Sequence, residues 1–136
     1  MATIEEILVR SKVIAVVGLS DQPERPSFGV AKYLQSQGYR VIPVNPNLDG
    51  PVLGERPYPS LEAVPEHVDL VDIFRRPEDV PPVVESAIAI RASAVWMQLG
   101  IIHDESAKKA AAAGLDVVMD RCTAIEHRRL RQQDRT

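Results

Sequence analysis

Five short apolar runs alternate with helical patterns along this sequence, and that alternation restricts the fold more than any other feature. The runs are Val13–Val17, Arg40–Val44, Val68–Phe74, Ala94–Gln98 and Asp116–Met119. Short continuous runs rich in β-branched residues are typical of strands that are buried on both faces of a sheet. Strands that alternate with helices over short connections predict βαβ units and a parallel sheet.

We therefore predict an α/β fold: a single Rossmann-like domain over residues 1–136, with helices on both faces of a five-stranded parallel sheet. The strand order that we expect is 3-2-1-4-5. Pro43 lies inside the second run, and proline cannot donate to a hydrogen-bonded ladder. The centre of the second strand is therefore the least regular part of the predicted sheet.

Capping and stop signals place the helices between these strands. Thr3 and Glu6 match a capping box, Ser27 is the expected N-cap of the second helix, and Gly38 is a natural stop for it. The predicted helical segments are 3–11, 27–37, 60–64, 77–88, 104–113 and 123–133.

Composition excludes several classes of function. The chain has 136 residues and a net charge of −3, so no overall basic charge points to nucleic acid or to an anionic membrane. A single cysteine rules out an internal disulfide, and the N-terminus lacks a signal-peptide pattern, so we expect a cytoplasmic protein. The three histidines are scattered without other metal ligands nearby, so no metal site is predicted.

The glycine turn after the first run is the first candidate for a ligand site. Gly18 follows the buried strand, and a helix begins near Ser27. A helix N-terminus offers unpaired N–H groups and partial positive charge to a phosphate. Ser20 stands where the dinucleotide fingerprint has its second glycine, and a serine there can offer a hydroxyl. The alternative is a plain turn with no ligand.

Other polar side chains follow the remaining strands. Arg75 and Arg76 come directly after Phe74, and guanidinium groups suit phosphate oxygens; Arg25 in the first loop is a further candidate. Gln98 ends the fourth strand and can read a base edge or an amide. Asn45 ends the second strand, where NAD-binding domains carry an acidic residue, so classical NAD binding is disfavoured. Asn45 is also a candidate contact for the ligand.

Cys122 ends the fifth strand, and it acts as a nucleophile only beside a base or in a positive field. His127 is poorly spaced to be that base, so no catalytic residue is predicted. Two alternatives stay open at this point: an NAD(P)-linked oxidoreductase and a Cys122-dependent acyl transferase.

Five strand-end segments carry a family resemblance. They are Val16–Ser20, Tyr39–Pro46, Val71–Pro77, Val95–Ile101 and Val118–Cys122. In this order and spacing they resemble the small, stand-alone CoA-binding domain proteins, which are similar to the N-terminal CoA-binding domain of the succinyl-CoA synthetase alpha subunit. The resemblance implies a module that binds coenzyme A, or an acyl-CoA, at the carboxyl edge of the sheet. A third alternative is a CoA-responsive interaction subunit of a larger complex, with a protein partner or as a homodimer.

The resemblance also implies particular contacts. The CoA phosphates would lie at Gly18, Ser20 and the loop that follows. Further contacts would come from the turn 74–77, which ends in Pro77, and from Met97, Gln98 and Leu99. The synthetase has a lysine after its second strand that this chain lacks, so an arginine would supply that charge. The ligase activity is not implied, because the synthetase's phosphorylated histidine belongs to a second domain.

Overall fold

A computed structural model describes residues 1–134 and contains one five-stranded parallel sheet. The strands are β1 (Val13–Val17), β2 (Arg40–Val44), β3 (Leu70–Ile73), β4 (Ala94–Met97) and β5 (Asp116–Val118). Every pair of neighbouring strands runs parallel, so all carboxyl ends share one edge of the sheet. The predicted α/β class and the parallel sheet are confirmed.

The predicted strand order 3-2-1-4-5 is wrong, because the strands lie in the order β2-β1-β3-β4-β5. β1 pairs with both β2 and β3, which leaves β2 at an edge. Pro43 accounts for this position, since an edge strand tolerates a residue without an N–H group better than an internal strand does.

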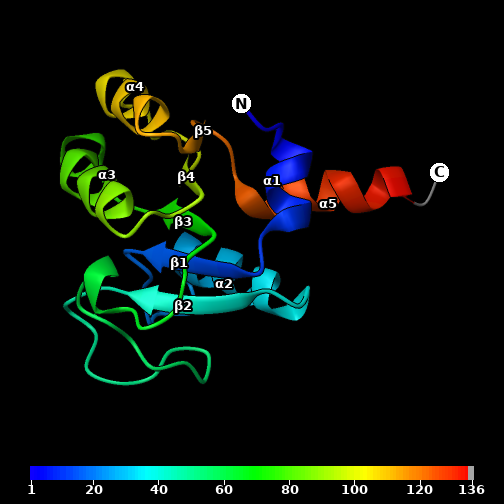
Figure 1. Cartoon of the computed structure of the whole chain (residues 1–136). Helices are drawn as coiled ribbons and strands as arrows, with labels where there is room; N and C mark the ends of the chain where they lie inside the picture. The colour runs from blue at the N-terminus through cyan, green and yellow to red at the C-terminus, as the bar shows by residue number, and fades with distance from the viewer. Residues whose placement is uncertain (135–136) are drawn as a thin grey trace.

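Helices cover both faces of the sheet (Figure 1), as predicted. One face packs against α1 (Ile4–Arg10), α2 (Pro26–Ser36) and α5 (Thr123–Asp134). The other packs against α3 (Val80–Ala89) and α4 (Asp104–Ala112). Two 3₁₀ turns, η1 (Leu61–Ala63) and η2 (Pro77–Asp79), lie before β3 and before α3.

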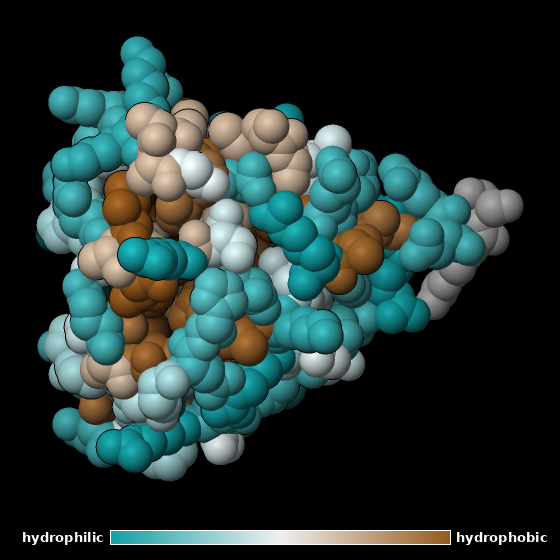
Figure 2. Space-filling model, viewed as in Figure 1, coloured by the Kyte–Doolittle hydropathy of each residue, from teal (hydrophilic) through white to brown (hydrophobic). Residues whose placement is uncertain are grey.

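Alternate residues of each strand enter opposite cores. In β4, Val95 and Met97 pack with α3 and α4, whereas Ala94 and Trp96 pack with α1 and α2. All four residues are 0% exposed, so the strand is buried on both faces. In the space-filling view, hydrophobic residues show mainly in recesses between hydrophilic ones (Figure 2).

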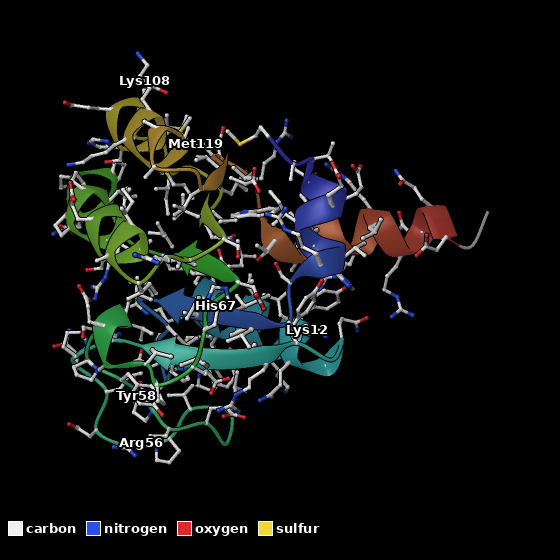
Figure 3. The ribbon with its side chains drawn as sticks, viewed as in Figure 1. Lys12, Arg56, Tyr58, His67, Lys108 and Met119 are labelled. Atoms are coloured by element: carbon white, nitrogen blue, oxygen red, sulfur yellow. The ribbon has the colours of Figure 1, made fainter. Side chains whose placement is uncertain are left out.

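Both edges of the sheet are occupied by irregular chain. Beside β2, the Tyr58 N–H donates to the Pro43 carbonyl at 3.0 Å, and the Tyr58 carbonyl accepts from the Asn45 N–H at 2.9 Å. Arg56 lies over the Tyr58 ring at 5.4 Å on this long segment (Figure 3). Beside β5, the Val117 N–H donates to the Met1 sulfur at 3.3 Å, and the Ala2 N–H donates to Asp116 at 2.8 Å.

Candidate functional site

The turn after β1 is built around a glycine that no other residue can replace without movement. Gly18 has φ +88°, and its N–H donates to the Val44 carbonyl at 2.9 Å. A Cβ at this position would lie 2.2 Å from the Phe74 carbonyl oxygen and 3.5 Å from Cδ of Arg75. The turn after β1 and the end of β3 therefore touch, and Arg75 passes over the glycine.

Two serine hydroxyls organise the loop between β1 and α2. The sequence predicts Ser27 as the N-cap of α2, but α2 begins at Pro26 and Arg25 is in the cap position. Instead, the Ser27 hydroxyl oxygen accepts the Ser20 N–H at 3.0 Å, and the Ser20 hydroxyl oxygen accepts the Gln22 N–H at 3.1 Å. Neither hydroxyl donates to another group in the described chain, so both hydrogens are available to an anion.

The three candidate arginines differ in their partners. The side chains of Arg25 and Arg75 form no ion pair or hydrogen bond within residues 1–134. Arg76 is 78% exposed and lies 3.2 Å from a Glu78 oxygen and 3.3 Å from an Asp79 oxygen. Arg25 and Arg75 therefore carry uncompensated positive charge, whereas Arg76 is already paired.

These groups surround a pocket of about 800 Å³ at the carboxyl ends of the strands. That volume lies within the ordinary range for small-molecule sites. Its wall contains most of the residues that the sequence predicts to bind the ligand: Gly18, Ser20, Arg25, Ser27, Phe74, Arg75, Arg76, Gln98 and Leu99.

Three of the predicted residues lie outside this wall. Met97 is 0% exposed and packs in the core on the α3 and α4 face. Pro77 is exposed at the start of η2. The Asn45 side chain donates to the Leu19 carbonyl at 3.1 Å, so it supports the loop after β1 from behind.

The pocket also contains side chains that the sequence did not single out as ligand contacts, including Gln22, Val30, Ile101 and Ile125. Val30 and Ile125 belong to α2 and α5, which both pack on the same face of the sheet. Cys122 completes this part of the wall. Residues that directly follow a strand can be expected at the carboxyl edge from the sequence alone. Helix residues such as Val30 and Ile125 can be placed in the pocket only when the strand order and the packing of the helices are known.

A buried polar network lies beneath Gln98. The Gln98 amide nitrogen donates to Asp72 at 2.6 Å and to the Thr123 hydroxyl at 2.8 Å, and that hydroxyl donates to Asp72 at 3.0 Å. Burial raises the pKa of Asp72 to about 7, although the hydrogen bonds from Gln98 and Thr123 act to lower it. The sequence carries a signal for this site, since Asp72 interrupts an apolar run.

The described residues contain no group of three or more His, Cys, Asp or Glu side chains that would hold a metal ion. Across residues 1–134, no helix has the length and apolar character needed to cross a bilayer.

Comparison with known proteins adds relatives to this geometry. The chain is 43% identical over 126 residues to the uncharacterized protein YneT of Bacillus subtilis strain 168, covering 93% of each chain. It is also similar to the structure of a hypothetical protein from Pyrococcus horikoshii, with a TM-score of 0.90 and 46% identity over 93% of this chain and 89% of that one.

A more distant likeness concerns the fold alone. The dinucleotide-forming acetyl-coenzyme A synthetase 1 of Candidatus Korarchaeum cryptofilum aligns with a TM-score of 0.75 and 24% identity. The alignment covers 87% of this chain and 28% of the synthetase. Residues 12–128 match the CoA binding domain family, so this chain, with its pocket at the carboxyl edge of the sheet, belongs to that family.

Proposed function

We propose that this protein binds coenzyme A or an acyl-CoA in the pocket at the carboxyl edge of the sheet, and that it acts as a binding module without catalysis of its own. The observation that carries the proposal is that Arg25 and Arg75, which line the pocket with Gly18, have no acidic or hydrogen-bonding partner within residues 1–134. Membership of the CoA binding domain family supports the same ligand.

The charges and hydroxyls suit the phosphate groups of CoA. Two guanidinium groups without protein partners can each form forked hydrogen bonds to phosphate oxygens. The free hydroxyl hydrogens of Ser20 and Ser27 add donors on the side of the loop. Because these groups lie close to the N-terminus of α2, the helix dipole favours an anion there.

The apolar part of the wall suits the remainder of the ligand. Phe74, Leu99 and Ile125 line the pocket, and Leu99 and Ile125 are 65% and 39% exposed. Exposed apolar side chains at a pocket mouth can cover the pantetheine arm or an acyl chain. Arg75 also borders a second cavity of about 220 Å³ beside Val44 and Pro46, which we assign to the adenine.

The pocket wall supports binding in preference to acyl transfer. Cys122 lies in the wall, but the residues that line the pocket with it include no histidine, aspartate or glutamate to take a proton from the thiol. The lining therefore supplies positive groups, Arg25 and Arg75, but no general base for the thiol, which favours binding over acyl transfer.

Calorimetric titration tests the proposal directly. Purified protein titrated with CoA, acetyl-CoA, NADH and NADPH should release heat with the two CoA compounds and not with the nicotinamide nucleotides. Cys122→Ser should bind CoA as the unchanged protein does. Absence of both heat and thermal stabilisation at millimolar CoA would refute CoA binding.

A further inference from the structure

Three buried polar side chains from three separate elements meet behind the pocket wall. Asp72 lies in β3, Gln98 follows β4, and Thr123 begins α5; their exposed fractions are 0%, 3% and 0%. A carboxylate buried in a parallel sheet is costly unless its oxygens are satisfied. Here Asp72 receives one hydrogen bond from Gln98 and one from Thr123.

This network fixes the orientation of the Gln98 amide. Both hydrogens of its nitrogen are used, one by Asp72 at 2.6 Å and one by Thr123 at 2.8 Å. One Asp72 oxygen accepts from the Gln98 nitrogen and the other accepts from the Thr123 hydroxyl, so the nitrogen of the amide faces Asp72 and the amide oxygen faces away.

The Gln98 amide oxygen has no hydrogen-bond partner within residues 1–134. Within residues 1–134, the only side-chain polar atom that is both fully buried and without a partner is the Ser11 hydroxyl oxygen. The Gln98 amide oxygen, which has no partner, is therefore not fully buried. Gln98 lines the large pocket. The amide oxygen is therefore the polar atom that Gln98 has left to offer a ligand.

We propose that Asp72 and Thr123 are positioning residues, which hold the Gln98 amide oxygen toward the pocket as an acceptor for an amide N–H of the ligand's pantetheine arm. This inference rests on the proposed function, since it names the part of CoA that Gln98 recognises. An acceptor oxygen disfavours a phosphate group, whereas Leu99 and Ile101 beside it in the wall suit an arm that is apolar between its amides.

Ligand fragments separate this role from a purely structural one. CoA, 4′-phosphopantetheine and adenosine 3′,5′-bisphosphate are titrated by calorimetry into the unchanged protein and into Gln98→Met, Thr123→Val and Thr123→Ser. Gln98→Met keeps the length of the side chain without the acceptor. Thr123→Val removes the hydroxyl at almost constant shape, and Thr123→Ser keeps it.

The first two variants should bind CoA and 4′-phosphopantetheine about 10-fold more weakly, the loss expected for one hydrogen bond. The affinity for adenosine 3′,5′-bisphosphate should not change, because that fragment has no pantetheine amide. Thr123→Ser should retain the affinity of the unchanged protein for all three compounds. Circular dichroism confirms that each variant is folded, and Thr123→Ala replaces the valine variant if that one is not.

Unchanged CoA affinity in folded Gln98→Met would overturn the inference. An equal loss of affinity for adenosine 3′,5′-bisphosphate would also overturn it, because the effect would then be a general change of the pocket. Failure of the unchanged protein to bind CoA is a separate result, which refutes the proposed function and the inference with it.

Discussion

The two ends of the parallel sheet both contain a concave surface, but the arginine side chains at the two ends differ in whether an acidic residue pairs with them. At the amino end, a hollow of about 570 Å³ includes Lys12, which precedes β1 at the end opposite its arrowhead (Figure 3). Two arginines at this end are paired with acids: Arg10 with Asp116, and Arg40 at the start of β2, which lies 3.1 Å from Glu55 and 2.8 Å from Glu66. At the carboxyl end, Arg25 and Arg75 have no such partners in the described chain.

This difference separates charges that support the fold from charges that are available to a ligand. The Asp69 carboxylate at the amino end accepts the N–H groups of Lys12 and Val13 at 2.9 Å, so it completes the hydrogen bonding of β1. The two ends are distinguished by the pairing of Arg10 and Arg40 with acids, against the unpaired Arg25 and Arg75. Substitutions of the paired arginines at the amino end should therefore change stability, and substitutions of the unpaired arginines at the carboxyl end should change ligand affinity.

The Gly18 turn is the point where the carboxyl end is most sensitive. Gly18→Ala places a methyl group against the Phe74 carbonyl oxygen at a backbone angle that alanine adopts poorly. We expect a loss of about 3 kcal/mol in the free energy of unfolding, together with loss of CoA binding. Urea unfolding and calorimetry measure the two effects.

Gly29→Ala is the matched control, because Gly29 lies in α2 and a Cβ there meets nothing within 4 Å. It should raise stability by roughly 0.5–1 kcal/mol, as expected for alanine within a helix. Equal effects of the two substitutions would show that the close contact at Gly18 does not matter.

The buried Asp72 makes stability depend on pH in an unusual direction. Burial raises the pKa of Asp72 from 3.8 to about 7, so the folded protein holds this proton more tightly than the unfolded chain does. The contribution of this group to stability is full below about pH 4 and is lost as the pH rises toward 7.

Asp72→Asn should therefore become more stable relative to the unchanged protein as the pH rises from 5 to 8, by on the order of 2 kcal/mol. Urea unfolding at a series of pH values gives this difference. A difference that stays constant across that range would contradict the raised pKa.

Neutralising the unpaired arginines should reduce affinity without reducing stability. Arg25→Gln and Arg75→Gln should each weaken CoA binding by about 10-fold or more, because each removes a charged hydrogen bond to phosphate. Arg76→Gln should have a smaller effect, since Glu78 and Asp79 already pair with this arginine.

The control for these variants lies at the other end of the sheet. Arg40→Gln should lower the free energy of unfolding by about 0.5–1 kcal/mol and leave CoA affinity unchanged. If Arg40→Gln weakened CoA binding as much as Arg75→Gln does, the contrast between the two ends would be lost.

Asp116 at the amino end should show the smallest effect, with the opposite sign to Asp72. A hydrogen bond from the Ala2 N–H, followed by the Arg10 side chain, lowers the pKa of Asp116 below its usual 3.8. Its contribution is present above about pH 4 and is lost as the pH falls. Asp116→Asn should be less stable than the unchanged protein at pH 7, by less than about 1 kcal/mol, and equally stable at pH 2 in urea unfolding.

Local sequence patterns predicted the positions of several strands and helices, and the structure confirms them. The run 13–17 forms β1 with the predicted ends, and the Thr3 and Glu6 capping box is formed. The strand order was wrong because pairing between distant segments leaves little local trace. Pro43 held the relevant information, since it marks an edge strand, and an order with β2 inside the sheet does not suit it.

The candidate pocket was predictable where it depends on strand ends. Arg75 and Gln98 follow strands directly, and both line the pocket. Met97 lies outside the pocket wall because side chains alternate along a strand, so it faces the core on the opposite side of the sheet from Trp96. Ile125 depends on how α5 packs on the sheet, which no short motif records.

The irregular chain along the two outer strands has a consequence for assembly. Tyr58 takes the hydrogen bonds that the outer side of β2 offers around Pro43, and Met1 takes the outward N–H of β5. An added strand from another molecule would have to displace these segments first. The sheet is therefore a poor template for strand addition or for aggregation from edge to edge, and association between molecules would have to use helices or loops instead.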